Sequence, residues 1–205
     1  MIERVASLAL VESWTLFLSV LTIRPATDFD HEAIWEIFRE VIVAGETYPL
    51  DPKISREAAL AYWFQRRAHV FVAQRNAESE GEAVGFPGTL AASPIETARR
   101  EEIVGSYTMH ANQSAGGAHV ANAGFIVAKS ARGLGIGRVL GEHCLKEARR
   151  RGFRAMQFNF VVSTNEFAVK LWQDLGMKIV GTLPGAFRHP TRGYVDVYVM
   201  YQEFI

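Results

Sequence analysis

Arg132-Gly133-Leu134-Gly135-Ile136-Gly137-Arg138 is the most informative segment of the chain, because it follows an apolar run at 124–127 and opens an amphipathic helix. Its glycines allow positive φ angles and let backbone N–H groups approach a ligand closely. The start of a helix adds unpaired N–H donors and the positive end of the helix dipole. The stretch is therefore typical of a strand-to-helix turn that binds phosphate oxygens. The alternative is a glycine-rich turn without a ligand.

Two common phosphate-binding motifs do not fit this stretch. The dinucleotide fingerprint requires a third glycine where Arg138 stands, and the P-loop requires Gly-Lys-Ser/Thr at its end. The pattern that does match is R-x-x-G-x-G, with Arg132, Gly135 and Gly137 at its defining positions. This pattern is the acetyl-CoA motif of the GNAT acetyltransferases, and the chain resembles that family.

A second segment strengthens the resemblance. Residues 165–177 are similar to the GNAT element N-x-x-A-x-x-L-Y-x-x-x-G-F, with Trp172 in place of Tyr and Met177 in place of Phe. The similarity extends over about 21–203. It implies an α+β fold, the GNAT acyl-CoA acyltransferase fold, with a mixed, mostly antiparallel sheet flanked by helices. In that fold the strand before the cofactor loop and the strand after its helix splay apart.

A narrower similarity connects the chain to GNAT enzymes that acetylate small amino acids and proline analogues. It rests on four short segments, at 47–49, 62–64, 122–125 and 158–160.

Composition favours one compact domain. The chain has 205 residues, of which 49% are hydrophobic, enough for a single sizeable core. We expect one GNAT domain at 21–205, an N-terminal extension at 1–20, and a mobile loop at 76–102, where Glu, Ala and Gly are frequent.

Charge and cysteine content limit the partners and the cellular setting that we expect. Lys plus Arg and Asp plus Glu both number 22, so no general attraction to nucleic acid is expected. The apolar stretch at 5–21 contains Glu12 and is short for a membrane span, so no membrane association is predicted. The single cysteine, Cys144, has the spacing of a core residue, which fits a reducing, cytoplasmic setting. No metal site is expected from six scattered histidines and one cysteine.

Hydrophobic periodicity predicts the order of elements. The expected strands are 21–24, 69–73, 102–110, 120–127, 155–162, 178–182 and 194–202, the last two joined by a loop at 184–193. The expected helices are one capped by Asp28 or Asp30, one at 55–64, one at 135–151, and one that a Ser163/Glu166 capping box starts and that ends at Leu175.

Acetyl-CoA is the cosubstrate that the resemblance implies. The predicted pyrophosphate contacts are Arg132, Gly133, Leu134, Gly135, Ile136, Gly137 and Arg138. The backbone of Phe125, Ile126 and Val127 would pair with the pantetheine arm, and an amide near Ile126 or Val127 would donate to the thioester oxygen. Asn165 would contact the arm or nearby backbone, or simply start a helix.

At the positions of the usual acid and base, the sequence departs from the family pattern. Trp172 stands where many GNAT enzymes carry the Tyr that protonates the thiolate, but an indole N–H is not an ordinary proton donor. We expect Trp172 in the core, and the proton from another Tyr, from water or by direct transfer. Asn122 stands where many family members have a basic carboxylate.

Two asparagines are the predicted catalytic groups. Asn122 and Asn159, on the strands expected to splay, would hydrogen-bond the acceptor amine or the tetrahedral intermediate, or form a structural network. Glu46, His110 and His119 are alternative bases, acting directly or through water.

The acceptor side is predicted from the places that line it in GNAT enzymes. These are Glu46 and Tyr48 in the first interhelical loop, Tyr62 and Trp63 beyond it, and Arg188 and His189 between the last strands. Arg188 would bind an acceptor carboxylate, unless it is a solvated loop residue.

We therefore predict an acetyl-CoA-dependent N-acetyltransferase whose acceptor is the primary or secondary amine of a small metabolite, an amino acid or a toxic analogue, which attacks the thioester directly. The alternatives are a protein N-terminal acetyltransferase and a non-catalytic acyl-CoA sensor. A homodimer is the expected assembly.

Overall fold

The computed structural model describes residues 21–77 and 100–204, and it confirms the α+β class with a mixed sheet. The strands lie in the order β1-β2-β3-β4-β5-β7-β6. They are β1 (Leu21–Pro25), β2 (His69–Ala77), β3 (Arg100–Ala111), β4 (Val120–Val127), β5 (Ala155–Val162), β6 (Lys178–His189) and β7 (Gly193–Glu203). The longer helices are α2 (His31–Ala44), α3 (Arg56–Trp63), α4 (Ile136–Arg150) and α5 (Glu166–Asp174).

The chain groups into two compact units. Of the first unit, 1–22 and 74–102, the structure describes only the strand residues 21–22, 74–77 and 100–102, among which Arg75 of β2 bonds to Glu102 of β3. The second unit, 23–73 and 103–205, contains every site residue discussed below. The predicted extension at 1–20 and most of the predicted loop at 76–102 lie outside the described residues. The single domain at 21–205 stays a prediction.

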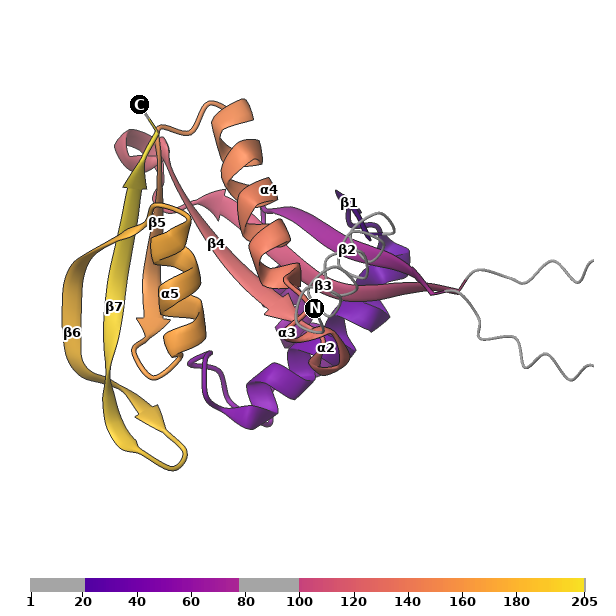
Figure 1. The fold of residues 1–205 in the computed structure, drawn as a ribbon, viewed down its shortest axis with the longest axis horizontal. Helices are drawn as coiled ribbons and strands as arrows, with labels where there is room; N and C mark the ends of the chain where they lie inside the picture. The colour runs from indigo at the N-terminus through magenta and orange to yellow at the C-terminus, as the bar shows by residue number, and fades with distance from the viewer. Residues whose placement is uncertain (1–20, 78–99, 205) are drawn as a thin grey trace, which may run out of the picture. The chain divides into compact units, whose positions relative to one another are not determined.

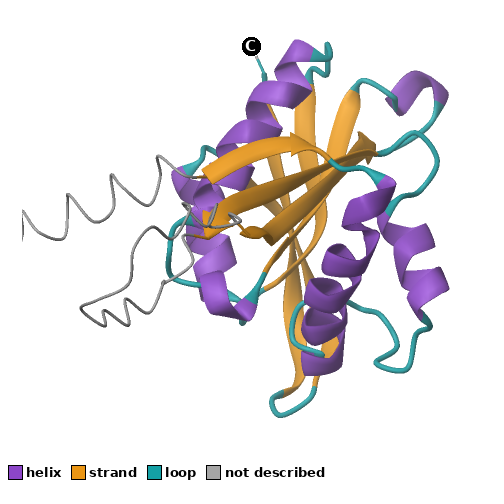
Figure 2. Cartoon of the chain, turned by 90° about the vertical axis from the view of Figure 1, so that its right-hand side faces the viewer, coloured by secondary structure: helices purple, strands orange, loops and turns teal. Residues whose placement is uncertain are grey.

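In the second unit, the side chains of β4 alternate between two helix layers. Ile126 belongs to a core cluster with buried residues of α2 and α3, whereas the ring of Phe125 lies 4.7 Å from that of Trp172 in α5. Figure 2 shows helices on both sides of the sheet. Because side chains of a strand alternate with period 2, Asn122 and Gly124 share the α2/α3 face with Ile126.

The strands β4 and β5 separate along their length. They are parallel and pair only at Val120 with Ala155 and Ala121 with Met156. Beyond these pairs the two ribbons diverge, while β4 remains paired with β3 (Figure 1). The splay expected from the resemblance is therefore present. We call the opening between β4 and β5 after these pairs the fork.

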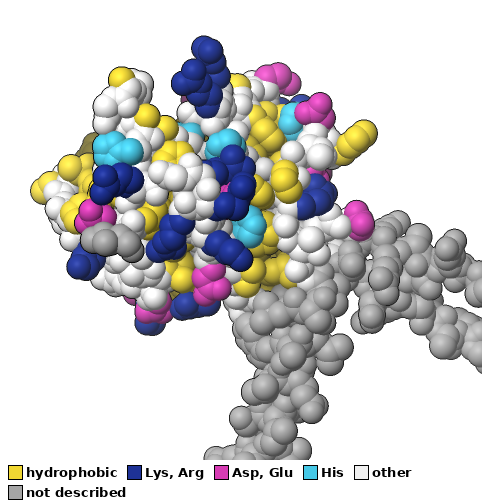
Figure 3. Space-filling model, turned by 90° about the horizontal axis from the view of Figure 1, so that it is seen from above, with side chains coloured by type: hydrophobic (Ala, Val, Ile, Leu, Met, Phe, Trp, Pro, Cys, Tyr) yellow, Lys and Arg dark blue, Asp and Glu magenta, His cyan; other side chains and the backbone are white. Residues whose placement is uncertain are grey.

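The helix α4 packs against β4 and β5, and it ends in basic residues. Arg150 and Arg151 both bond to Glu147, each with a closest distance of 2.7 Å, and lower the pKa of that carboxyl to about 2. The Arg149 guanidinium lies 4.3 Å from the centre of the Phe204 ring. Figure 3, which views the end of Figure 1 where α4 finishes, shows Lys, Arg and His side chains gathered on this face. Such cations stabilise a helix C-terminus.

The buried Cys144 of α4 confirms the predicted core position.

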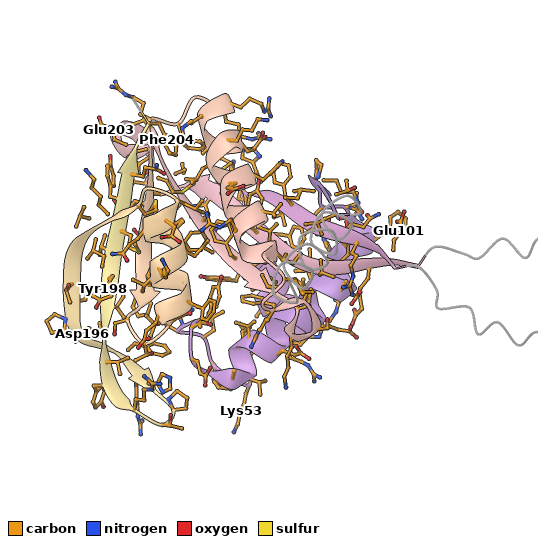
Figure 4. The ribbon with its side chains drawn as sticks, viewed as in Figure 1. Lys53, Glu101, Asp196, Tyr198, Glu203 and Phe204 are labelled. Atoms are coloured by element: carbon orange, nitrogen blue, oxygen red, sulfur yellow. The ribbon has the colours of Figure 1, made fainter. Side chains whose placement is uncertain are left out.

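Several boundaries differ from those predicted. The strands β2 and β3 are longer, and β6 continues to His189 through most of the segment predicted as a loop. A register shift between Leu183 and Phe187 accommodates Pro184 and Gly185, and the Gly185 N–H donates to Asp196 Oδ1 of β7 at 2.9 Å (Figure 4). The predicted Ser163/Glu166 capping box is wrong, because Asn165 is the N-cap of α5.

Candidate active site

The turn before α4 has the geometry that a phosphate ligand requires. Gly133 and Gly135 have φ angles of 77° and 76°. Gly135 is the N-cap of α4 and no side chain caps the helix, so the N–H groups of Ile136 and Gly137 keep the unpaired state of a free helix end. Among the described residues, apart from its two chain neighbours, no atom lies within 4 Å of a Cβ built on Gly133. The turn therefore fits an anionic group that is bound by backbone N–H donors.

Both arginines of the motif have defined places. Arg132 is exposed at the end of the short helix before the turn. Arg138 is held by the protein, because its N–H bonds to Gly135 O at 3.0 Å and its guanidinium bonds to Asp174 of α5 at 3.1 Å. A phosphate contact from Arg138 would have to share its side chain with Asp174.

Asn165 caps α5, which is the structural alternative considered for it. Its Oδ1 accepts the Ala168 N–H at 3.2 Å. A contact of Asn165 with the cosubstrate arm would therefore use the remaining side-chain N–H groups.

Alternate residues of β4 bond to β3, and this alternation, the hydrogen-bond phase of the strand, decides which amides face the fork. Asn112 N donates to Val120 O at 2.8 Å and Ala128 N to Val104 O at 2.9 Å, at opposite ends of the β3–β4 ladder. Between them the register is unbroken, and antiparallel bonds alternate along a strand. Even-numbered residues of β4 therefore bond to β3. Odd-numbered residues turn their N–H and C=O groups toward the fork.

This phase separates the residues predicted to pair with the pantetheine arm. Phe125 and Val127 face the fork, whereas Ile126 belongs to the β3 ladder opposite Ser106. Of the two amides considered for the thioester oxygen, Ile126 is thus unavailable, because its N–H already has a strand partner. The apolar run alone could not reveal this, because the phase depends on pairing with β3.

Tyr48 lies directly at the fork. Its hydroxyl donates to Phe125 O at 3.1 Å, and a Cβ added to Gly124 would lie 2.9 Å from the Tyr48 oxygen. Burial raises the pKa of Tyr48 far above its ordinary value, with a smaller contribution from Tyr62. Tyr48 is therefore a neutral hydrogen-bond donor at any working pH, and Gly124 is needed for its approach.

Trp172 fills the fork from the α5 side. It is 7% exposed, and its ring lies 4.7 Å from that of Phe125 and 4.9 Å from that of Phe158. The prediction that Trp172 is a core residue is confirmed. It separates β4 and β5 as a wedge, and neither its burial nor its chemistry suits a proton donor.

Amide side chains gather on the opposite face of the fork. His110 pairs with Asn122 across β3 and β4, so the two share the α2/α3 face. Asn159 Nδ2 donates to Asn112 Oδ1 at 2.6 Å, and Gln157 Nε2 donates to Asn159 Oδ1 at 2.8 Å. We call these five side chains, His110, Asn112, Asn122, Gln157 and Asn159, the acceptor face.

Two members of the acceptor face were not predicted. Gln157 could have been found from its i, i+2 spacing with Asn159 on one strand face. Asn112, which follows β3, could not, because its bond to Asn159 is a tertiary contact between residues 47 positions apart.

The loops predicted to surround the acceptor meet in the structure. A Cβ added to Gly45, directly after α2, would lie 3.9 Å from Cγ of Pro190 at the tip of the β6–β7 hairpin. Glu46 and Arg188 are exposed on these two segments. His189 is buried, and its Nδ1 accepts the Thr191 N–H at 3.2 Å.

Trp63 supports the site from beneath rather than lining it. It is 0% exposed, and its indole N–H donates to Ser106 Oγ at 3.1 Å. Because no part of its side chain is accessible, the predicted acceptor contact of Trp63 does not fit this structure. Tyr62, in contrast, is 43% exposed.

Across 21–77 and 100–204, no group of three or more His, Cys, Asp or Glu side chains is arranged to hold a metal ion. In the same ranges, no helix combines the length and apolar character needed to cross a membrane.

Comparisons with known proteins point to one family. The model of the acetyltransferase (GNAT) family matches residues 31–177. The chain is 32% identical over 164 residues to N-acetyltransferase aca1 of Schizosaccharomyces pombe, an alignment that covers 80% of this chain and 75% of that protein.

Solved structures have the same fold. A GCN5-related N-acetyltransferase from Kribbella flavida is 41% identical, with a TM-score of 0.75 and coverage of 91% of this chain and 99% of that one. A phosphinothricin acetyltransferase from Sinorhizobium meliloti, solved with acetyl-CoA, is 20% identical, with a TM-score of 0.69 and coverage of 90% and 89%.

Proposed function

Because the chain belongs to the GNAT acetyltransferase family and uses acetyl-CoA as cosubstrate, we propose that it acetylates the amine of a small metabolite that also carries a carboxylate, such as an amino acid or an amino-acid analogue. The observation that carries this proposal is the acceptor face, where amides and one imidazole line the fork. A polyamine or aminoglycoside would require an acidic groove, whereas the acceptor face as defined contains no Asp or Glu side chain and its amides can donate to a carboxylate.

The donor side of the site would bind the pyrophosphate and the pantetheine arm of acetyl-CoA. The backbone N–H groups at 133–137, in the turn and at the start of α4, would hold the pyrophosphate, with the exposed Arg132 adding charge. The fork-facing backbone of Phe125 and Val127 would pair with the pantetheine arm. Bound there, acetyl-CoA supplies an activated acetyl group as a thioester.

The polarising donor is proposed to be an odd-numbered amide of β4. The phosphate turn follows the C-terminal end of β4, so an arm that runs from this turn toward the closed end of the fork brings its thioester closer to Phe125 than to Val127. The Phe125 N–H is therefore our candidate for the thioester oxygen, a type of contact typically worth about 3 kcal/mol of barrier. The Tyr48 bond to Phe125 O would hold this peptide in place.

The acceptor would lie between the acceptor face and the two loops that meet at Gly45 and Pro190. Asn122 and Asn159 would orient the amine, and Glu46 or Tyr48 would contact the acceptor from the loop after α2. Arg188 would bind its carboxylate. The contact between the two loops supports a small acceptor, because a protein N-terminus would need an open groove.

A panel of matched acceptors tests the acceptor class. Release of CoA thiol would be measured with L-proline against pyrrolidine, L-alanine against ethylamine, and peptides with free N-termini. We expect selective release with the carboxylate-bearing member of each pair. Stronger release with the peptides would establish protein N-terminal acetylation instead. Acetyl-CoA binding without any release would favour the sensor.

The role of Arg188 is tested separately. Arg188→Ala should raise KM for the amino acid at least tenfold with kcat little changed, because the lost contact is made equally in the ground and transition states. Arg192→Ala, an exposed residue of the same hairpin, is the matched control. Equal effects of the two substitutions would argue against a carboxylate contact.

A further inference from the structure

The reaction needs a base, and the acceptor face has no carboxylate at the strand position where one would be expected. The amine of an amino acid is protonated near neutral pH, and only its neutral form can attack a thioester. Asn122 cannot accept a proton for this purpose, because an amide has no basic nitrogen. A neighbouring group must therefore supply a lone pair.

His110 is the nearest strand neighbour of Asn122. The two residues are register partners in β3 and β4, and directly opposite Cβ atoms in such a pair lie about 5 Å apart. This pair lies one residue beyond Ala121, the last β4 residue paired with β5. His110 is half-buried, and as the register partner of Asn122 its side chain leaves the same face of the sheet.

The hydrogen bond of His110 fixes which ring nitrogen is free. Its Nδ1 lies 2.9 Å from Ala111 O. A carbonyl oxygen only accepts, so Nδ1 carries the hydrogen in this bond. In the neutral imidazole the other nitrogen, Nε2, then has an unshared lone pair.

The other candidate bases are less well placed. Glu46 is exposed on the loop after α2, and His119 is exposed at the start of β4. The backbone carbonyl of His119 bonds to Arg154 N, which holds it at the closed end of the parallel pair.

The surroundings of His110 leave its lone pair available. Titratable side chains on the same face of the sheet include Tyr48, whose hydroxyl would lie 2.9 Å from a Cβ at Gly124, and Tyr201, the register partner of Gln157. Within the described residues, the His110 side chain forms its hydrogen bond through Nδ1 and has no ion pair.

We propose that His110 is the general base of the acetyl transfer, a step that rests on the proposed function. Nε2 removes one proton from the acceptor ammonium and later passes it to bulk water. The nitrogen lone pair then forms the N–C bond to the acetyl carbon, and the C–S bond breaks with its electron pair on sulfur. The second nitrogen proton goes to sulfur, so the products are the amide, CoA thiol and one released proton.

The pH dependence of kcat/KM is the test in the full-length enzyme. His110→Gln should lower kcat/KM at pH 7 by about 10²- to 10⁴-fold, the usual contribution of a general base, while acetyl-CoA affinity stays unchanged. The loss should shrink above pH 9, where more of the acceptor amine is neutral. His119→Gln, the matched control, should keep the wild-type profile. A His110→Gln loss that is equal at every pH, or no loss, would overturn the proposal.

A second measurement does not depend on the acceptor. Nitrogen-15 shifts of the imidazoles in the free enzyme should show that the neutral form of His110 carries its hydrogen on Nδ1. The opposite tautomer would refute the base role even in an active enzyme. If instead no amine is acetylated but the Nδ1–H form is found, the proposed function fails and the geometry of His110 stands.

Discussion

Two glycines in the turn before α4 hold backbone angles that other residues rarely adopt. A side chain at φ near 77° costs about 1–2 kcal/mol, wherever in the chain it occurs. The same cost applies at Gly152, which follows α4 and has φ 84°. At both Gly133 and Gly152 a built Cβ meets nothing within 4 Å. The two positions therefore share a positive φ and open surroundings, and only Gly133 lies in the turn proposed to bind phosphate.

Gly133→Ala and Gly152→Ala form a matched pair that separates strain from ligand binding. Both should lower the free energy of unfolding by about 1 kcal/mol. Only Gly133→Ala should weaken acetyl-CoA binding, by at least tenfold, because its methyl group occupies space needed by the phosphates. Calorimetric titration with acetyl-CoA and urea unfolding measure the two effects. Equal affinities of the two variants would remove the turn from the cosubstrate site.

Tyr48→Phe isolates the hydroxyl bond to Phe125 O. The ring contacts with Phe38 and Trp63 remain, so the expected loss is that of one hydrogen bond, about 1 kcal/mol of unfolding free energy. Tyr62→Phe, whose ring also stacks on Phe38, should change stability by less than about 0.5 kcal/mol. Urea unfolding at pH 7 measures both, and a larger effect of Tyr62→Phe would contradict the assignment.

The sequence predicted the burial of single side chains better than it predicted their hydrogen-bond partners. The core position of Trp172 followed from its helical spacing, and the structure confirms it. The burial of Trp63 was missed, because adjacent aromatic residues such as Tyr62 and Trp63 can line a binding site or pack in the core. The bond between Asn159 and Asn112 joins residues 47 positions apart, and no local pattern contains such a pairing.

At the scale of elements, α4 and α5 pack closely because Gly141 has no side chain. A Cβ there would lie 2.7 Å from Leu175 Cδ1 and 2.9 Å from Trp172 Cζ3. Trp172 in turn contacts Phe125 and Phe158. A small residue on α4 thus sets the position of the wedge in the fork.

Gly141→Ala should destabilise the protein even though alanine favours a helix. The propensity gain is about 1 kcal/mol, whereas overpacking costs about 1–3 kcal/mol, and the rigid Trp172 ring makes the larger cost decisive. We expect a net loss of about 1 kcal/mol in thermal or urea unfolding. Gly137→Ala is the control, because its Cβ would lie 3.5 Å from Leu171 Cδ2, an ordinary contact. A stabilised Gly141→Ala variant would show that α5 can shift freely.

Regular elements were predictable where local pattern and tertiary pairing agree. The strands β4 and β5 have the predicted limits, and α4 is within one residue of its prediction at each end. The extent of β6 was wrong, because Pro184 and Gly185 favour a loop and only pairing with β7 keeps them in a strand. The cap of α5 was wrong by two residues, because Ser163 and Asn165 are both good caps and the chain direction after β5 decides between them.

At the scale of the whole molecule, two carboxyl groups link stability to pH. The Arg24 guanidinium beside Asp30 lowers the pKa of that carboxyl to about 2, as Arg150 and Arg151 do for Glu147. Because both folded-state pKa values are depressed, their stabilisation is complete above the ordinary range near pH 4. It is lost as the pH falls toward 2.

Asp30→Asn should remove much of this dependence. The shift from 3.8 to about 2 corresponds to about 2 kcal/mol of unfolding free energy at pH 7. Urea unfolding between pH 2 and pH 6 should therefore give a flatter curve for Asp30→Asn than for the wild type. Asp28→Asn, a fully exposed neighbour, should keep the wild-type slope. Parallel curves for the wild type and Asp30→Asn would assign the acid sensitivity elsewhere.

Because of the fork, the two edges of β4 should exchange their amide hydrogens with solvent at different rates. The N–H groups of Gly124 and Ile126 are bonded to β3, while those of Ala123, Phe125 and Val127 point into the opening. In heavy water, deuterium should replace the second set much sooner than the first, giving fast and slow amides in strict alternation along one strand. Residue-resolved exchange would then distinguish an open fork from one closed by a bound acyl donor, because saturating acetyl-CoA should slow only the odd-numbered positions. A uniform rate along 123–127 would mean that β4 opens as a whole.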